Sequence, residues 1–437
     1  MKVLKFGGTS VGSASRMKEV AKIICDGEKK VVVLSAMSGT TNSLVQYSDA
    51  LYKGESKKAL EVINALEDKY FGVIDELYED EIVKDDAQDM VKSHFNYMRS
   101  FLDSEFTPFE EKAILSQGEL LSTALFQFYL HEIKANSVLI PALDFMRINQ
   151  AEEPDTKYLS KHLTRILASY PDKEIYLTQG FICRNLYGEI DNLKRGGSDY
   201  SASLIGAAIH ADEIQIWTDI DGMHNNDPRY VEKTSPVRLL NFHEAAELAY
   251  FGAKILHPTC ILPARVNGIP VRLLDTMEPS AQGTLISDKS EQGTVKAVAA
   301  KDGITAIKIK SGRMLLAYGF LRKVFEIFES YQTPIDVVTT SEVGVSVTID
   351  DCHNLDKIVA DLQKFGDVTI DEKMVIICVV GDLDPANVGV NTRIMQAMEH
   401  IPVRMISYGG SNYNISFIIP EEYKKQALNA LSNILFS

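Results

Sequence analysis

Residues 2–10 read Lys-Val-Leu-Lys-Phe-Gly-Gly-Thr-Ser, an apolar strand pattern that ends in a glycine pair and two hydroxyl side chains. Glycine lets the backbone approach a ligand closely, and free N–H groups before a helix favour an anion. A helical pattern follows from about Ser13 to Cys25, and Lys5 adds a positive charge. The stretch therefore predicts a phosphate site on an α/β fold. Taken alone, however, the segment favours a tight strand-to-helix turn over a phosphate site.

Two common phosphate motifs are excluded here. Gly7 and Gly12 have the spacing of the Walker motif, but Ser13 occupies the position where that motif requires lysine. The GxGxxG fingerprint of dinucleotide sites is absent as well.

Outward from this stretch, short β-branched runs alternate with helical patterns. Residues 30–35, 174–178 and 213–218 read as further strands. This rhythm is typical of an α/β fold with a mainly parallel sheet. Between about 50 and 112, apolar residues recur at helical spacing among acids and lysines, which predicts a helical excursion that covers the sheet or forms a lid.

The chain then changes character. Residues 278–294 are polar and rich in helix and strand breakers, so we expect a domain boundary there and a catalytic domain over about 1–290. Beyond it, 304–372 reads as strand, helix, strand, strand, helix, strand, and a second such unit starts at 374 but lacks its last strand. We expect 295–300 to supply that strand, because a sheet edge would otherwise stay exposed. The regulatory region would thus span 295–437.

Composition narrows the function. The 437 residues carry 45 basic and 60 acidic side chains, a net charge of −15 that disfavours general nucleic-acid binding. Five cysteines without a CxxC pair argue against a disulfide framework or a cysteine-rich zinc site and favour the cytoplasm. No run approaches the ~20 apolar residues of a membrane span, and the glycine pair interrupts the N-terminal apolar run before it could serve as a signal peptide.

Polar loops follow several of the expected strands. Residues 35–42 (SAMSGTTN) could bring hydroxyl groups to the carboxyl edge of a parallel sheet, or could be a plain hydrophilic connection. Residues 217–229 place three acids and an arginine after a strand, an arrangement that could hold a nucleotide and Mg²⁺. Ser116 and Glu119 fit a capping box, while Glu119 could instead bind an ammonium group.

Two basic residues complete the set of candidates. Arg195 precedes two glycines, Ser198 and Asp199 at a helix start, where arginine suits bidentate binding of a carboxylate. A glycine turn with an N-cap is the alternative, but a cap needs neither the arginine nor both glycines. Lys254, in FGAKILHP (251–258), is an isolated lysine at a helix break and carries little weight alone.

In their order and spacing, these motifs resemble those of the aspartate kinases of the amino-acid kinase superfamily. The resemblance runs from residue 1 to about 290 through KFGGTS, SAMSGTTN, Gly118-Glu119, QGF (179–181), RGGSD, WTDIDG with DPR, and FGAKILHP. The tail resembles that family's paired ACT domains. The resemblance implies a three-layer sandwich with a mainly parallel sheet, followed by two ferredoxin-like ACT domains.

It also implies ATP-dependent phosphorylation of the side-chain carboxylate of L-aspartate, with Mg²⁺, as the first step toward lysine, threonine and methionine. The site roles that it carries over fall into three groups. The catalytic residues would be Lys5, Asp199 and Lys254. Aspartate would contact Thr41, Glu119, Phe181, Arg195, Gly196 and Ser198. The nucleotide would contact Lys5, Gly7, Gly8, Ser10, Thr218, Asp219, His224, Asp227, Arg229, Lys254 and Ile255. His224 stands where a tyrosine is more usual.

For the tail, the resemblance implies feedback inhibition by an amino acid and a homodimer formed through the ACT domains. The run TTSEVGVSVTID is most similar to the lysine-sensitive type, which implies lysine binding around Met314, Gly319, Asp336, Thr340 and Ser341. Ala317 replaces a serine of that type, and threonine is the alternative effector. We expect no homoserine dehydrogenase after Ser437. The competing interpretations are a kinase for another amino acid or a nucleotide monophosphate, and an inactive amino-acid sensor.

Overall fold

The first unit of the chain is built around a mainly parallel sheet. The structure is a computed structural model that describes residues 1–193, 196–252, 258–289, 291–311 and 318–436, and it divides into units of 1–223 with 256–288 and of 224–255 with 289–437. In the first unit the strands follow the order β3-β4-β2-β1-β7-β9-β10. They are β1 Lys2–Phe6, β2 Lys30–Leu34, β3 Ser137–Leu139, β4 Ile175–Gln179, β7 Ile214–Thr218, β9 Val271–Asp275 and β10 Thr284–Ser287.

The strand predictions for this unit are confirmed. β1 pairs in parallel with β2 and β7, β2 pairs in parallel with β4, and β7 with β9, while β10 is antiparallel to β9. All five residues of β2 are buried, as expected for a strand covered on both faces. A separate hairpin joins β5 Ile182–Arg184 to β6 Ile190–Asn192.

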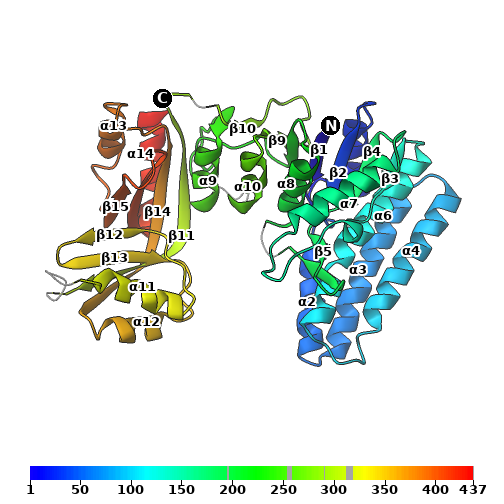
Figure 1. The fold of residues 1–437 in the computed structure, drawn as a ribbon, viewed down its shortest axis with the longest axis horizontal. Coiled ribbons are helices and arrows are strands. Elements are labelled where there is room, and N and C mark those ends of the chain that lie inside the picture. The colour runs from blue at the N-terminus through cyan, green and yellow to red at the C-terminus, as the bar shows by residue number, and fades with distance from the viewer. Residues whose placement is uncertain (194–195, 253–257, 290, 312–317, 437) are drawn as a thin grey trace. The chain divides into compact units, whose positions relative to one another are not determined.

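Helices cover both faces of this sheet, which gives the three-layer arrangement (Figure 1). They are α1 Ala14–Ile24, α2 Thr40–Tyr52, α3 Ser56–Leu77, α4 Glu81–Arg99, α5 Pro108–Leu115, α6 Gln117–Glu132, α7 Thr156–Ala168, α8 Gly197–Ile209 and α10 Pro258–Val266, with a short 3₁₀ helix at Ala142–Asp144. The predicted helical excursion corresponds to α3, α4 and α5. Its buried Tyr70 and Phe95 belong to the same core as Val32 and Leu34 of β2, so the excursion covers the sheet. Among the described helices, none is long and apolar enough to cross a membrane.

Two long strands organise the second unit. β11 Val295–Lys310 and β14 Asp367–Gly381 lie antiparallel at the centre of the order β12-β13-β11-β14-β16-β15. The other elements are β8 Leu239–Asn241, α9 Phe242–Tyr250, α11 Phe320–Ser330, β12 Val338–Ser341, β13 Gly344–Ile349, α12 Leu355–Leu362, α13 Val390–Ala397, β15 Met405–Tyr408, β16 Asn414–Pro420, a 3₁₀ turn at Glu421–Tyr423 and α14 Lys424–Leu435.

The start of β11 fills the edge that the second repeat lacks. Val298 pairs with Val379 and Ala300 with Ile377, so the segment 295–300 joins β14 of the second repeat. Residues 304–310 of the same strand pair with β13 of the first repeat. The segments read as separate strands in the sequence are therefore continuous, and one strand serves both repeats.

The compact units divide the chain differently from the expected boundary near residue 290. Residues 224–250 pack with the second unit, although they precede β9 and β10 in the sequence. Asn226 Nδ2 donates to the Leu428 carbonyl, and Val231 lies in the core that Val375 and Phe417 form. The hydrogen bond of Asn226 and the apolar contacts of Val231 are both buried, and together they hold this segment on the second unit.

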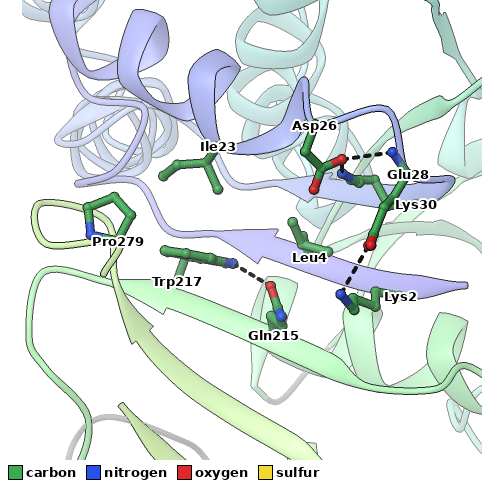
Figure 2. A pocket seen from close by; sticks show the side chains of 9 residues that line it. All are labelled: Lys2, Leu4, Ile23, Asp26, Glu28, Lys30, Gln215, Trp217 and Pro279. Atoms are coloured by element: carbon green, nitrogen blue, oxygen red, sulfur yellow. Dashed lines mark hydrogen bonds and ion pairs between the residues drawn. The ribbon is translucent and has the colours of Figure 1, made fainter. Parts of the chain in front are cut away.

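A cavity of about 270 Å³ opens on one face of the first unit's sheet (Figure 2). Leu4, Ile23, Trp217 and Pro279 form its apolar part, and its polar part consists of Lys2, Asp26, Glu28, Lys30 and Gln215. Because side chains alternate along a strand, Lys2 and Leu4 face this cavity, while Lys5 points to the other side of the sheet. None of the predicted site residues that the structure describes lines it.

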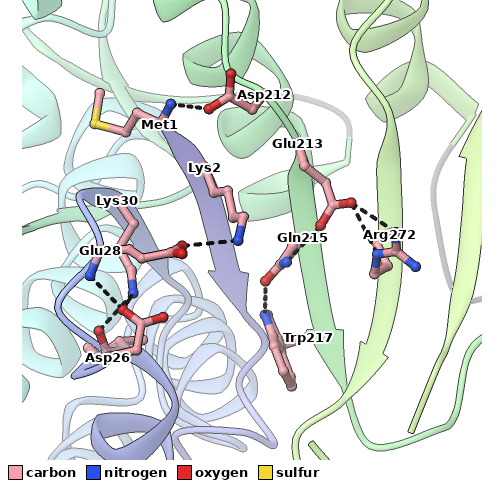
Figure 3. A network of polar contacts seen from close by, with 11 residues as sticks. Met1, Lys2, Asp26, Glu28, Lys30, Asp212, Glu213, Gln215, Trp217 and Arg272 are labelled. Carbon is pink, nitrogen blue, oxygen red and sulfur yellow. Dashed lines mark hydrogen bonds and ion pairs between the residues drawn. The ribbon is translucent and has the colours of Figure 1, made fainter. Parts of the chain in front are cut away.

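The charges around this cavity neutralise one another (Figure 3). Lys2 Nζ lies 3.0 Å from Glu28 Oε2, and Lys30, which is 1% exposed, pairs with the half-exposed Asp26. Lys30 Nζ also donates to the Ile24 carbonyl at 3.0 Å. Since each charge has its partner within the lining, the network supports the strand ends and presents no uncompensated charge to a ligand.

We predict that Asp26→Asn destabilises the first unit by about 2 kcal/mol, because it removes the counter-charge of the buried Lys30 ammonium while keeping the shape of the side chain. Urea unfolding measures this change. Adding Lys30→Met should restore most of the loss, since no buried charge then remains. Glu19→Gln is the matched control, because its partner Lys22 is exposed and such pairs contribute about 0.5 kcal/mol. Equal losses for Asp26→Asn and Glu19→Gln would contradict the prediction.

Candidate functional site

An ion pair between β1 and α8 lies at the centre of the candidate site. Lys5 Nζ is 2.6 Å from Asp199 Oδ1, and the two side chains are only 11% and 18% exposed. Lys5 is the fourth residue of β1, and Asp199 lies in the first turn of α8. The structure thus joins two residues that the sequence analysis assigned to catalysis.

The glycine pair after β1 lies in a loop with close backbone contacts, and these contacts require glycine at position 8. Gly7 N donates to the Trp217 carbonyl at 3.3 Å, and Ser38 N donates to the Gly8 carbonyl at 3.0 Å. A Cβ atom on Gly8 would lie 2.8 Å from the Ala36 carbonyl oxygen, and one on Gly7 would lie 3.4 Å from Lys5 Nζ. A side chain at Gly8 would therefore press on the loop after β2, while a Cβ on Gly7 would lie at ordinary contact distance from the lysine amine. The loop comes close to the carboxyl ends of β2 and β7, where ligands of open α/β sheets bind.

Hydroxyl groups continue this surface. Ser10 is buried, and its Oγ lies 2.7 Å from Thr276 Oγ1. Thr276 N in turn donates to the Thr218 carbonyl at 2.9 Å, which connects the end of β7 to the glycine loop. Asp219 follows Thr218 and is exposed. Ser10 and Thr218 thus belong to one hydrogen-bonded edge, and Asp219 extends from it into solvent.

Glu119 does not form the capping box that its spacing allowed. Ser116 has helical backbone angles and makes no side-chain cap, since its N–H already donates to the Lys112 carbonyl as α5 runs into α6. Instead, Glu119 Oε1 accepts from Ala36 N at 3.2 Å, directly after β2. Burial raises the pKa of Glu119 to about 7, against hydrogen bonds that lower it.

The loop after β4 packs tightly against the start of α8. Phe181 has a φ of 65°, uncommon for a side chain of this size, and its N–H donates to Ser201 Oγ at 2.8 Å. A Cβ on Gly180 would lie 2.3 Å from Ser198 Cβ. Gly196 has a φ of 70° and precedes the first turn of α8. These contacts bring Phe181, Gly196 and Ser198 together with Asp199.

The loop after β2 receives a contact that the sequence analysis missed. Lys69 of α3 donates to the Ser38 carbonyl, and Thr40 Oγ1 lies 3.1 Å from the buried Tyr70 hydroxyl. Thr40 therefore faces the core, while Thr41 is exposed, as a ligand contact requires. No sequence signal marked Lys69, because a lysine in an exposed helical pattern has no distinguishing spacing.

Other predicted residues lie in the second unit or outside the described residues. In the second unit, Arg229 Nη2 pairs with Asp227 Oδ2 at 2.7 Å, and His224 Nδ1 lies 2.8 Å from Thr234 Oγ1. Burial raises the pKa of Asp227, but the hydrogen bonds and positive charge of Arg229 have the larger combined effect. They hold the pKa of Asp227 below its usual range. Arg195, Lys254, Ile255 and Met314 lie outside the described residues.

The remaining effector candidates lie in the second unit. Gly319 is the N-cap of α11 with a φ of 81°, while Thr340 and Ser341 are exposed on β12. Asp336 precedes β12, and its carboxylate is shielded from solvent.

The described residues contain no group of three or more His, Cys, Asp or Glu side chains placed to hold a metal ion. Asp219 is an exposed carboxylate beside Thr218, and Mg²⁺ commonly uses one or two carboxylates together with phosphate and water ligands.

Comparison with known proteins gives one consistent result. Residues 1–275 match the amino acid kinase family, and residues 377–435 match the ACT domain. Lysine-sensitive aspartokinase 3 of Escherichia coli is 33% identical over 99% of both chains, and aspartokinase 1 of Arabidopsis thaliana is 35% identical over 99% of this chain and 80% of the relative.

Solved structures agree. The structure of E. coli aspartokinase III in complex with aspartate and ADP (R-state) aligns over the whole of both chains with a TM-score of 0.86 and 32% identity. The same enzyme in complex with lysine and aspartate (T-state) aligns over the whole of both chains with a TM-score of 0.81 and 33% identity. The buried lysine–aspartate pair, the glycine loop and these full-length similarities show that the chain belongs to the amino acid kinase family and, within it, to the aspartokinases.

Proposed function

We propose that this chain transfers the γ-phosphoryl group of ATP to the side-chain carboxylate of L-aspartate and so forms 4-phospho-L-aspartate. This reaction opens the route to lysine, threonine and methionine. The observation that carries the proposal is the buried Lys5–Asp199 pair beside the Gly7-Gly8 loop. The full-length similarity to a structure holding aspartate and ADP supports the choice of substrates.

The chemistry needs positive charge more than it needs a base. An aspartate carboxylate has a pKa of about 3.9, so it is ionised at neutral pH and is ready to attack. It must, however, approach an anionic phosphate. Lys5, held by Asp199, would place an ammonium group beside the transferring phosphoryl group, and Lys254 would add a second charge. In-line positioning and charge stabilisation are the main protein contributions to phosphoryl transfer.

The substrate aspartate would be held by both its α-carboxylate and its α-ammonium group. Arg195 would bind the α-carboxylate and Glu119 the ammonium, with Thr41, Phe181, Gly196 and Ser198 around the substrate. The contacts of Glu119, Phe181 and Ser198 with the ends of β2 and β4 support this arrangement. The nucleotide would lie on the side of Thr218 and Asp219, with His224, Asp227, Arg229, Lys254 and Ile255 as further contacts. When bound, Mg²⁺ would neutralise phosphate charge.

We infer further that the ACT region binds lysine as a feedback inhibitor, with Gly319, Asp336, Thr340 and Ser341 among its contacts. The similarity to a lysine-bound aspartokinase supports this choice over threonine. A homodimer through this region is also proposed, because Tyr318, Leu321, Phe325, Val338 and Val343 leave an exposed apolar group on and beside α11 and β12. Sedimentation at micromolar concentration tests the dimer, and a monomer would contradict it.

We predict ATP turnover that depends on L-aspartate, measured by coupled ADP release and by trapping the acyl phosphate as a hydroxamate. Turnover should fall when lysine is added and should be little changed by threonine. Activity with glutamate, acetylglutamate or a nucleotide monophosphate in place of aspartate would reject the substrate assignment. Absence of turnover with every acceptor would favour an inactive sensor.

We predict that Lys5→Ala and Asp199→Ala each lower kcat by at least about a hundredfold, because the cation next to the phosphoryl group is lost or displaced. Circular dichroism should show an intact fold. Lys2→Ala is the matched control: this lysine lies on the same strand but faces the other side of the sheet, so its kcat should stay near that of the unaltered chain. Comparable losses for Lys2→Ala and Lys5→Ala would contradict the assigned role.

We predict that the KM for aspartate rises about tenfold as the pH falls from about 8 to about 6, because a carboxyl with a pKa of about 7 loses its charge over this range and no longer attracts the substrate ammonium. Steady-state kinetics at several pH values measure this dependence. Glu119→Gln should raise the KM at every pH and remove this part of the dependence. A KM profile unchanged by Glu119→Gln would exclude the residue from ammonium binding.

A further inference from the structure

Two side chains of the second unit, those of Lys301 and Tyr250, contact the carboxylate of Asp336. Its side chain exposes only 1% of its surface. Lys301 Nζ of β11 lies 2.6 Å from Asp336 Oδ1, and the Tyr250 hydroxyl donates to the same oxygen at 3.0 Å. Lys301 Nζ also lies 2.8 Å from Asp350 Oδ2 and 4.9 Å from the centre of the Tyr250 ring. The ammonium group of Lys301 is thus already paired with the carboxylate that the effector is proposed to bind.

We propose that Lys301 is a built-in occupant of the ammonium position of the effector site, which a lysine effector displaces from Asp336. This inference rests on the proposed regulation by lysine. The side chain of Lys301 and that of the effector end in the same primary ammonium on the same four-carbon chain, so both suit one buried carboxylate. Their charges repel, which disfavours simultaneous contact with Asp336.

The geometry allows this exchange without stranding a charge. Removing one partner from a buried ion pair is costly because the other charge stays unpaired. Here the effector ammonium would replace Lys301 on Asp336, while Lys301 would keep Asp350, which is 40% exposed. The Lys301 side chain itself is 20% exposed, so it has a route towards solvent.

Asp336 offers the effector ammonium an oxygen on which the exchange can begin. Its Oδ2 atom is buried and has no hydrogen-bond partner within the described part of the chain. Burial raises the pKa of Asp336 even with Lys301 beside it. For Lys301, burial opposes the charge, but the hydrogen bonds to Asp336 and Asp350 outweigh it and raise its pKa. The competition is therefore between two charged ammonium groups for one incompletely satisfied carboxylate.

The cluster also connects the exchange at Asp336 to the helix α9 of the same unit. Tyr250 is the last residue of α9, and its hydroxyl shares Asp336 Oδ1 with Lys301. Displacement of Lys301 changes the partners of the group that holds the end of this helix. In the sequence, Lys254 of the proposed phosphate site follows four residues later. Threonine offers only its α-ammonium and lacks the four-carbon chain that ends in an ammonium group in both Lys301 and a lysine effector.

Calorimetric titration with lysine tests the proposal on the full-length chain. An internal occupant lowers apparent affinity by the fraction of molecules in which the position is free, so its removal should tighten binding. We expect Lys301→Met to bind lysine about tenfold more tightly than the unaltered chain. Lys301→Gln should shift in the same direction and provides a second variant if the methionine disturbs folding, which circular dichroism checks. Lys310→Met, at the exposed end of the same strand, is the matched control and should leave affinity unchanged.

The outcomes separate this inference from the catalytic proposal. Equal or weaker lysine binding by folded Lys301→Met and Lys301→Gln overturns it, because Lys301 would then support the site and not compete for it. Lysine binding by neither the unaltered chain nor the variants, with aspartate phosphorylation intact, overturns the inference and leaves the catalytic proposal standing. Tighter binding by the variants without aspartate phosphorylation supports the inference and rejects the catalytic proposal.

Discussion

The contact between Lys5 and Asp199 is the constraint on which the candidate site depends. It joins the end of a central strand to the first turn of α8, with both side chains largely shielded from water. At such a position electrostatic attraction is stronger than at the surface, and loss of one partner leaves a buried charge. The pair therefore fixes both the location of an ammonium group and the approach of α8 to β1.

Close packing of the loops around this pair determines the shape of the rest of the site. Gly8 allows the loop after β1 to lie against the carbonyl of Ala36, and Gly180 allows the loop after β4 to lie against Ser198. Glu119 then reaches the backbone after β2 from α6. Loops that follow different strands thus form one surface because glycine permits contacts that a Cβ atom would prevent. The cavity lined by Trp217 lies on the other face of the sheet from Lys5, and its charges are mutually paired.

In the second unit, the strand β11 connects the two repeats and carries a charged residue of the predicted effector site. One strand, β11, pairs with β13 of the first repeat and, through its first residues, with β14 of the second. It also carries Lys301, which contacts Asp336 of the predicted effector site and lies over the ring of Tyr250. Residues 224–250 pack with this unit, and α9, the helix that precedes the predicted Lys254 position, lies against β11 and β14.

The sequence by itself predicted four strands of the parallel sheet, the helical excursion and the positions of the candidate motifs, because periodicity and glycine spacing are local properties. The missing last strand of the second repeat even predicted that residues 295–300 would close its sheet. Only the tertiary structure decided that Glu119 accepts from Ala36 and forms no capping box, that Lys69 reaches the Ser38 carbonyl, and that Asp336 already holds Lys301. These facts join residues far apart in the chain, and partners at such separations are set by packing of whole elements, which local pattern does not encode.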